Sequence, residues 1–143
     1  MKKSGLRSAC PVNYGLEQLG DKWTLLVIRD LVFEGKRFYK EFLASEEGIA
    51  TNVLSDRLKR LEASGIIVSA VNESQRTQKI YSLTDKGLDL VPMLVEMMIW
   101  SANHKSGLNI SEGFVAKLAT DKAEIIQSIR EAVGTKKFSA TQP

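Results

Sequence analysis

The sequence predicts a mainly α-helical protein with one small β-hairpin, which is an α+β fold class. Apolar residues recur at the three- and four-residue spacing of amphipathic helices along most of the chain. The spacing changes to two only from Ile66 to Asn72 and from Gln78 to Leu83, on either side of a five-residue polar loop. A pair of helices joined by a tight turn precedes this hairpin, so the order of elements predicts a winged helix-turn-helix with helical dimerisation elements.

The helix expected between Gly48 and Gly65 is the second helix of that pair. Leu54, Leu58 and Leu61 share one of its faces, and Gly65 is placed to end it in a left-handed conformation. The opposite face carries short polar and charged side chains, namely Asn52, Ser55, Asp56, Lys59 and Arg60. A helix is ~10–12 Å across and the DNA major groove is ~12 Å wide, so this helix suits a groove. The competing interpretation, an ordinary amphipathic surface helix, is less favoured because a hairpin follows.

Three further helices are expected before it. The first begins at Pro11, which suits a first helical turn, and ends near Gly20. Asp21 is the expected cap of a second helix, Lys22 to Phe33, which is apolar around much of its circumference and should lie in the core. The third, Tyr39 to Ser45, is the first helix of the helix-turn-helix.

Two helices are expected after the hairpin. Thr84 or Asp85 should cap a long helix that Pro92 bends. The tail should be helical from Ser111 to Val133 and end at Gly134, and it contains the spacing of a capping box at Asp121 and Glu124. We expect residues 1–104 to form the DNA-binding domain and residues 105–143 a C-terminal extension associated with dimerisation.

The apolar surface of these last two helices predicts a homodimer. It comprises Leu94, Val95, Met98 and Trp100 in the long helix and Ile125, Ile126 and Ile129 in the tail. A helix that is apolar over most of its circumference needs a second partner. A two-fold dimer built from the first helix, the long helix and the tail would bind a pseudo-palindromic operator in double-stranded DNA, with successive half-sites ~34 Å apart.

Composition is that of a globular cytoplasmic protein. The 143 residues are 43% hydrophobic and 26% charged, and the net charge of +3 permits a polyanionic partner without requiring one. No apolar run reaches membrane-spanning length, and the first ten residues lack the apolar core of a signal peptide. We therefore expect neither a membrane partner nor secretion.

Enzymatic chemistry has little support. The chain has one cysteine, Cys10, and one histidine, His104, which exclude an intrachain disulfide and a multi-histidine or multi-cysteine zinc site. Neither a phosphate-binding glycine-rich loop nor a nucleophile-elbow pattern is present. We expect no enzyme activity, no cofactor and no metal site.

Between Cys10 and His104 the sequence resembles the HxlR family of bacterial winged-helix transcriptional regulators, which are relatives of the MarR group. The matching segments are CPVNYGLEQLGDKWTLLVIRDL at 10–31, RF at 37–38, GIATNVLSDRLKRLEASGII at 48–67 and YSLTDKGLDLVPML at 81–94. The resemblance implies homodimers that bind operator DNA, several of which respond to thiol-reactive or quinone-like compounds through the cysteine of the CP dipeptide. It makes Cys10 a candidate sensor. This chain departs from the family at Ala50 and Asn52, where serine and a basic residue are usual, and its wing has no proline.

The candidate DNA-binding residues lie mainly on the second helix of the helix-turn-helix. Asn52 can pair with an adenine edge, and Lys59 is expected to contact phosphate. Asp56 either accepts a hydrogen bond from a cytosine amine or, as we favour, pairs with Arg60 at i+4. The full set is Lys36, Arg37, Thr51, Asn52, Ser55, Asp56, Arg57, Lys59 and Arg76.

Some of these residues have an alternative role. Arg57 lies beside the leucine stripe, so it either braces the fold or reaches the DNA backbone. Arg76 at the wing tip either enters a minor groove or contacts phosphate, or it is only a solvated side chain. Lys36 and Arg37 are expected to contact phosphate.

Cys10 has two interpretations of equal weight. It is either a small packing residue near the dimer interface or a reactive thiol whose thiolate is favoured by Lys2, Lys3 and Arg7. Two functions of different class follow from the whole sequence. The favoured one is a DNA-binding regulator, and the alternative is a winged-helix module that binds only proteins.

Overall fold

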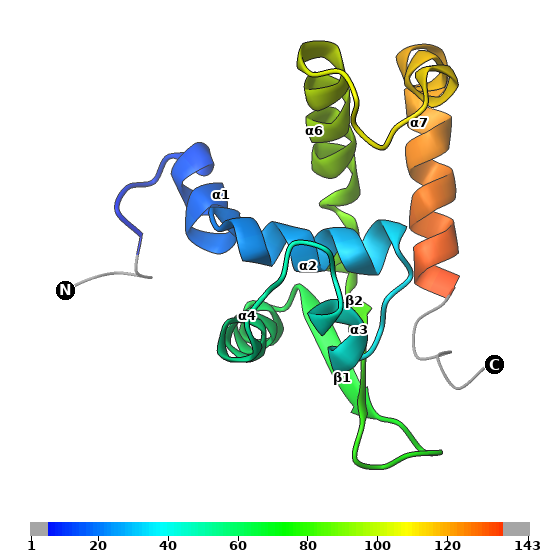
Figure 1. Cartoon of the computed structure of the whole chain (residues 1–143). Helices are drawn as coiled ribbons and strands as arrows, with labels where there is room; N and C mark the ends of the chain where they lie inside the picture. The colour runs from blue at the N-terminus through cyan, green and yellow to red at the C-terminus, as the bar shows by residue number, and fades with distance from the viewer. Residues whose placement is uncertain (1–5, 136–143) are drawn as a thin grey trace.

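The computed structural model describes residues 6–135 of the chain and confirms the winged-helix fold class (Figure 1). Its elements in chain order are α1 (Pro11–Leu19), α2 (Lys22–Phe33), α3 (Tyr39–Leu43), α4 (Thr51–Ala63), β1 (Ile67–Val71), β2 (Lys79–Leu83), α5 (Asp85–Leu88), α6 (Val91–His104) and α7 (Glu112–Thr135). The strands pair antiparallel, with Ile67 opposite Leu83 and Val71 opposite Lys79.

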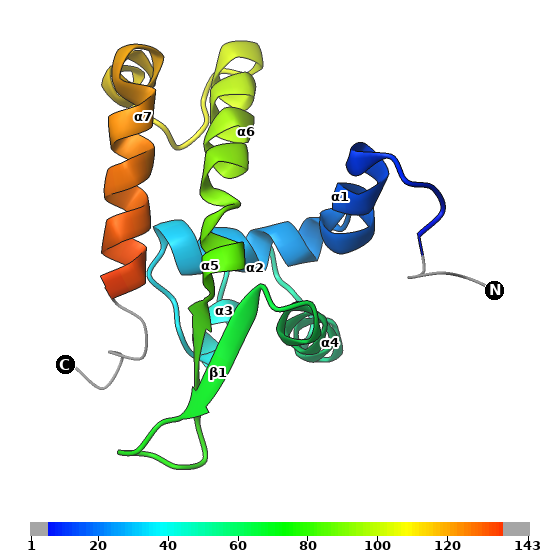
Figure 2. The same ribbon diagram turned by 180° about the vertical axis from the view of Figure 1, so that it is seen from behind.

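Helix α2 runs through the centre of the molecule. Figures 1 and 2 show α6 and α7 rising on one side of it, while α3, α4 and the hairpin lie on the other. The Asp21 carboxylate accepts a hydrogen bond from the Thr24 amide at 2.9 Å, so the predicted cap is confirmed. Val27 and Ile28 are buried, as predicted for a core helix.

Helix α4 docks through its leucine face. Leu54, Leu58 and Leu61 are 0%, 3% and 1% exposed, and their side chains belong to the main hydrophobic core. The chain enters through Gly48 with φ 76° and leaves through Gly65 with φ 79°. The left-handed conformation of Gly65 confirms the predicted helix end, because a side chain is strained at such a φ.

The prediction of a single long helix after the hairpin is wrong. The Thr84 hydroxyl accepts a hydrogen bond from the Gly87 amide and so caps only the four-residue α5. The chain then turns at Asp89 and Leu90 before α6 begins. Pro92 lies in the first turn of α6, where its missing N–H and fixed φ cost nothing, so it helps to start the helix and does not bend it.

The tail helix α7 is interrupted at Asp121, whose φ of −123° and ψ of 32° are not helical. This is the residue that begins the predicted capping-box spacing. Helix α7 extends to Thr135, so the prediction that Gly134 ends it is wrong.

Helix α7 packs on its own chain. Leu118 is 0% exposed, and the stripe that includes Ile125 and Ile129 is half-buried against the core. Arg130 donates to the Leu88 carbonyl at 2.7 Å and to Asp89 at 2.9 Å, which ties α7 to the turn between α5 and α6. The prediction that this stripe is left uncovered within one chain is therefore wrong. It is also wrong for Leu94 and Val95 of α6, which are 5% and 1% exposed and belong to the core of the single chain. The boundary expected at residues 104 and 105 stays a prediction.

A polar network joins α2 to the turn between α3 and α4. Asp30 is 2% exposed and accepts hydrogen bonds from Arg29 at 2.7 Å and from the Ser45 hydroxyl at 2.6 Å. Arg29 also pairs with Glu47 at 2.6 Å. A buried carboxylate is tolerated only with such partners, so the network fixes the turn that precedes α4.

This network should make stability depend on pH. The hydrogen bond from Arg29 lowers the pKa of Glu47 to about 2, against about 4.3 in an unfolded chain. A lowered pKa stabilises the fold above the unfolded value, and that contribution disappears as the pH falls toward 2. In urea unfolding from pH 7 to pH 2, Glu47→Gln should therefore be less stable than wild type above pH 5 and converge with it near pH 2. Glu46→Gln, which alters the exposed neighbour, is the control. A wild-type advantage that is the same at every pH would contradict the assignment.

Candidate nucleic-acid interface

The polar face of α4 is exposed over its whole length. Thr51, Asn52, Ser55 and Lys59 are all exposed, while the leucines behind them are buried. Figures 1 and 2 place α4 and the hairpin on the side of α2 opposite α6 and α7. The structure thus brings the helix and the wing, the two elements predicted to meet DNA, to one side of the molecule.

Tyr39 supports the beginning of α4. Its hydroxyl donates to the Thr51 carbonyl at 3.1 Å and lies 3.3 Å from the Ser55 hydroxyl. Sequence reasoning missed this residue, because the contact joins two helices and no local spacing reveals it. The only signal is that a tyrosine stands at the first position of the first helix of the helix-turn-helix.

Arg57 braces α4 against α2. Its guanidinium donates to both carboxylate oxygens of Asp21, at 2.7 and 3.1 Å, and to Asp56 at 2.6 Å. The hydrogen bond from Arg57 holds the pKa of Asp21 well below its usual range. These contacts favour the bracing alternative for Arg57. Asp56 also lies 3.2 Å from Arg60, in the i+4 pairing that the sequence favoured for it.

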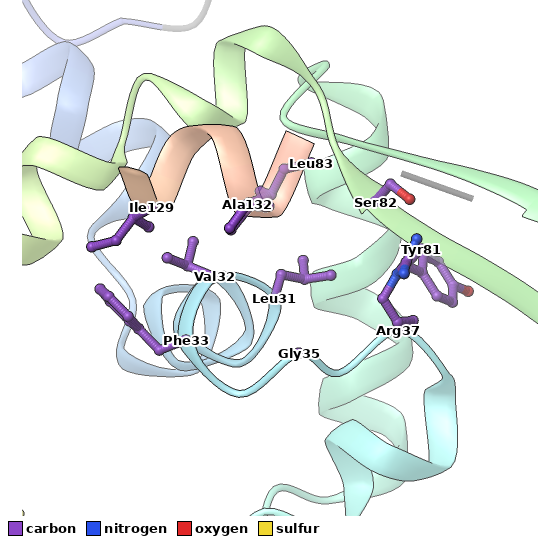
Figure 3. Close-up of a pocket in the computed structure, with 11 residues that line it drawn as sticks. Leu31, Val32, Phe33, Gly35, Arg37, Tyr81, Ser82, Leu83, Ile129 and Ala132 are labelled. Carbon is purple, nitrogen blue, oxygen red and sulfur yellow. The ribbon is translucent and has the colours of Figure 1, made fainter. Parts of the chain in front are cut away.

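Lys36 and Arg37 lie in the linker between α2 and α3. The Lys36 ammonium donates to the Ser45 hydroxyl at 2.7 Å. Figure 3 shows the Arg37 guanidinium directed toward Tyr81 and Ser82. Burial lowers the pKa of Arg37, against the opposing effect of Glu41. Both basic side chains therefore also contact other residues of the chain.

The wing is organised by Asn72, which sequence reasoning also missed. Asn72 is buried, donates to the Gln78 side chain at 2.9 Å and accepts from the Ser74 amide and hydroxyl. An asparagine at the end of a strand often makes such local bonds, which is the signal that was available. Arg76 is exposed near the wing tip and pairs with Glu73 at 2.7 Å.

Cys10 is exposed at the beginning of α1. Its carbonyl oxygen accepts a hydrogen bond from the Tyr14 amide at 3.0 Å, and its amide donates one to the Ser8 hydroxyl at 3.3 Å. Arg7 is exposed nearby in sequence, whereas Lys2 and Lys3 lie outside the described residues. Within one chain, therefore, Cys10 is open to solvent.

Over residues 6–135 no helix is long and apolar enough to span a membrane. The same residues contain no group of three or more histidine, cysteine, aspartate or glutamate side chains placed to hold a metal ion.

Comparison with known proteins identifies the family. The family model of the HxlR-like helix-turn-helix matches residues 18–108. The chain is 36% identical over 88 residues to sll1512, an uncharacterised helix-turn-helix-type transcriptional regulator of Synechocystis sp.. That alignment covers 62% of this chain and 64% of sll1512, slightly less than two thirds of the relative.

Two solved structures share the fold. PA1607, a candidate transcription factor, superposes with a TM-score of 0.65 and 37% identity over 74% of this chain and 72% of its own. The redox regulator HypR in its oxidised form superposes with a TM-score of 0.60 and 31% identity over 68% of this chain and 100% of its own. Because regulators of this family are DNA-binding proteins without enzyme activity, the prediction of no enzyme is confirmed. The match over residues 18–108, on a chain folded as a winged helix-turn-helix, shows that this protein belongs to the HxlR-like helix-turn-helix family.

Proposed function

We propose that the chain is a homodimeric, sequence-specific DNA-binding transcription regulator. The observation that carries the proposal is the division of α4 into a leucine face buried in the core and a polar face exposed to solvent. The leucines fix the helix, and the short side chains opposite them let the backbone approach base edges in a major groove. The wing on the same side supplies a second contact.

The exposed residues divide by role. Asn52 reads a base and Lys59 neutralises a phosphate. Thr51 and Ser55, at the start of the helix, contact the sugar-phosphate backbone of the DNA. Arg76 reaches the minor groove or its phosphates. Lys36, Arg37, Asp56 and Arg57 belong to the predicted set, but their side chains are held by the contacts described above, so we assign them to positioning α4 and the linker.

Substitutions on α4 should separate base reading from phosphate contact. Asn52→Ala should weaken operator binding by ~1–3 kcal/mol and leave random DNA unaffected, because a bidentate base contact is lost. Lys59→Ala should weaken both DNAs alike and reduce the salt slope by about one unit. Fluorescence anisotropy with the DNA upstream of the gene, at several salt concentrations, measures both effects.

Lys117→Ala is the matched control, because Lys117 is exposed on α7, on the other side of α2. It should bind as wild type does. If the wild-type chain shows no salt-dependent binding to any duplex, the protein-interaction alternative replaces the proposal. If it binds DNA but both α4 variants match wild type, α4 is not the reading helix.

The proposed dimer uses apolar side chains that the single chain leaves exposed. They are Val12, Tyr14 and Leu16 of α1 and Met93, Met97 and Trp100 of α6, here called the dimer face. Exposed apolar patches of this kind mark association sites in proteins that otherwise bury such residues. The two α4 helices of a two-fold dimer would then meet successive major grooves.

Thiol sensing at Cys10 is a second proposed property, and the likeness to the redox regulator HypR supports it. Cys10 is exposed and adjoins α1, part of the proposed dimer face. A quinone that adds to the Cys10 thiolate would place a bulky group between the subunits and change the spacing of the two α4 helices. A two-electron thiol oxidant such as diamide, which takes up both thiol hydrogens, could instead join the two copies of Cys10 in a disulfide if their Cα atoms approach within ~7 Å, with the same effect.

Treatment with benzoquinone should therefore change operator affinity in wild type and leave Cys10→Ser unchanged. Anisotropy titrations of both proteins measure the affinity, and intact mass confirms one adduct per wild-type chain. Because Cys10 is the one cysteine in the sequence, the variant controls for reaction elsewhere. A wild-type chain fully modified at Cys10 with unchanged affinity would leave Cys10 as a packing residue only.

A further inference from the structure

A cleft of about 660 Å³ lies beside α2, bordered by α6, by the segment that joins α6 to α7, and by the turn that joins α3 to α4. Figure 1 shows the segment between α6 and α7, in yellow, descending between those two helices. Drug-sized ligands occupy clefts of about 300–1,000 Å³, so this cleft has room for an organic molecule.

Much of the cleft is lined by apolar side chains. They come from α2, from α6 and from the segment after α6, and they include Leu25, Leu26, Phe33, Met97, Met98 and Leu108. Met97 and Leu108 are 46% and 41% exposed, so apolar surface of the cleft is open to water. An apolar ligand would remove that surface from water, and flexible methionine side chains can adapt to its shape.

The charged side chains that line the cleft are mainly acidic. Its two cations are already paired, because Arg29 lies 2.7 Å from Asp30 and 2.6 Å from Glu47, and Lys36 lies 3.5 Å from Asp30. The other two charged side chains that line the cleft are Glu34 and Glu46. Both are exposed, and neither carboxylate makes a hydrogen bond or an ion pair with any residue between 6 and 135. The cleft therefore has a local excess of negative charge, on a chain whose net charge is +3.

We propose that this cleft binds a lipophilic organic cation, which is a monovalent cation with a bulky apolar body. Tetraphenylphosphonium is a simple example. Its rings would lie against the apolar walls, and its charge would be attracted by the carboxylates of Glu34 and Glu46. The ring of Phe33, which also lines the cleft, can attract a cation through its negatively polarised face.

The charge and the lining of the cleft together select this class of ligand. An anion of the same shape would gain the apolar contacts but would be repelled by Glu34 and Glu46. A small inorganic cation would leave the apolar walls in water. Because the positive charge of a lipophilic cation is spread over apolar groups, it needs no hydrogen-bonding partners inside the cleft, and the two carboxylates can keep their water.

The position of the cleft sets it apart from the proposed DNA-reading face and from Cys10. None of the described residues that line it belongs to α1 or α4. Met97 is shared with the dimer face, and Glu47 is in the turn that precedes α4 and is paired with Arg29. A ligand in the cleft would therefore contact both α6 and the polar network that fixes the start of α4.

Two ions of nearly the same size and shape but opposite charge test the site. Calorimetric titration of the full chain without DNA, in sodium buffer because potassium precipitates tetraphenylborate, compares tetraphenylphosphonium with tetraphenylborate. The cation should bind wild type at least about fivefold more tightly, a modest preference because exposed charge pairs are individually weak. The net charge of +3 would favour the anion, so a preference for the cation reports the local carboxylates. Amide shifts in NMR spectra should fall on residues 25–34, 97–98 and 108–110. The absence of DNA keeps this result independent of the proposed DNA-binding function.

A double variant locates the charge of the ligand. Glu34→Gln with Glu46→Gln should weaken tetraphenylphosphonium at least about threefold and should not weaken tetraphenylborate. The matched control is Glu17→Gln with Glu131→Gln, which makes the same change in net charge at exposed positions on α1 and α7 and should keep the preference of wild type. Thermal unfolding checks that both double variants fold, and the comparison of the two ions on wild type needs no variant.

Four results would each overturn the proposal. They are equal or tighter binding of tetraphenylborate by wild type, no binding of tetraphenylphosphonium at about 1 mM, amide shifts confined to other residues, and the same affinity for the cation in the two double variants.

Discussion

Leu118→Ala is expected to lower the free energy of unfolding by about 2–5 kcal/mol, the range for a leucine deleted from a packed core. Leu118 is 0% exposed, and it lies in α7, a helix outside the family match. Removing its side chain leaves a void that a close-packed interior fills only in part. Urea unfolding followed by circular dichroism measures the change.

Leu108→Ala is the matched control, because Leu108 is 41% exposed in the segment between α6 and α7. It should cost about 0.5 kcal/mol or less, as surface substitutions usually do. The contact is within one chain, so the difference between Leu118→Ala and wild type should be the same at low and high protein concentration. If Leu118→Ala is as stable as wild type, α7 does not complete the core.

The parts of the fold that the sequence predicted correctly depend on local signals. Asp21 caps α2, and Gly65 ends α4, because a carboxylate near free amides and a glycine at positive φ act over a few residues. The buried face of α4 follows from helical spacing alone. For the same reason the exposed face that we propose to contact DNA was visible in the sequence.

The errors depend on contacts between distant segments. Two residues before the break between α5 and α6, Gly87 packs against the residue that precedes β1, so closely that a Cβ atom at position 87 would clash with the Ile66 carbonyl oxygen. Nothing local announces that contact. The stripe on α7 was predicted correctly, but an apolar stripe does not specify whether its own chain or a second chain covers it.

The candidate site shows the same division. The exposure of Asn52 and Lys59 follows from their positions on a helix. The partner of Arg57, by contrast, is Asp21, 36 residues earlier. The Arg37 side chain is directed toward Tyr81 and Ser82 of β2, which lie more than 40 residues later. Basic residues in a sequence therefore identify possible phosphate contacts. They do not reveal which of those side chains are already bonded to other residues of the same chain.

Trp100→Glu is expected to convert the proposed dimer into a monomer. Trp100 is 65% exposed in the single chain, with Met97 exposed one turn earlier on α6. Its ring packs on His104 with a centroid distance of 4.7 Å, which leaves much of the indole available to a partner. Tryptophans at the centre of interfaces typically contribute ~2 kcal/mol or more each. Because a two-fold dimer loses the tryptophan of both subunits, its dissociation constant should rise about 1,000-fold.

Sedimentation velocity at protein concentrations from about 0.1 to about 100 µM measures the change, because that range lies on both sides of a dissociation constant of ~1 µM. Ala116→Glu introduces the same charge at an exposed position on α7 and should leave the dimer intact, because α7 packs on its own chain. The monomeric Trp100→Glu chain should keep a folded α4 but bind operator far more weakly, since one half-site no longer helps to hold the other. A wild-type chain that sediments as a monomer would contradict the proposed dimer and would leave each α4 helix to bind DNA alone. A Trp100→Glu chain that remains a dimer would contradict the proposed dimer face.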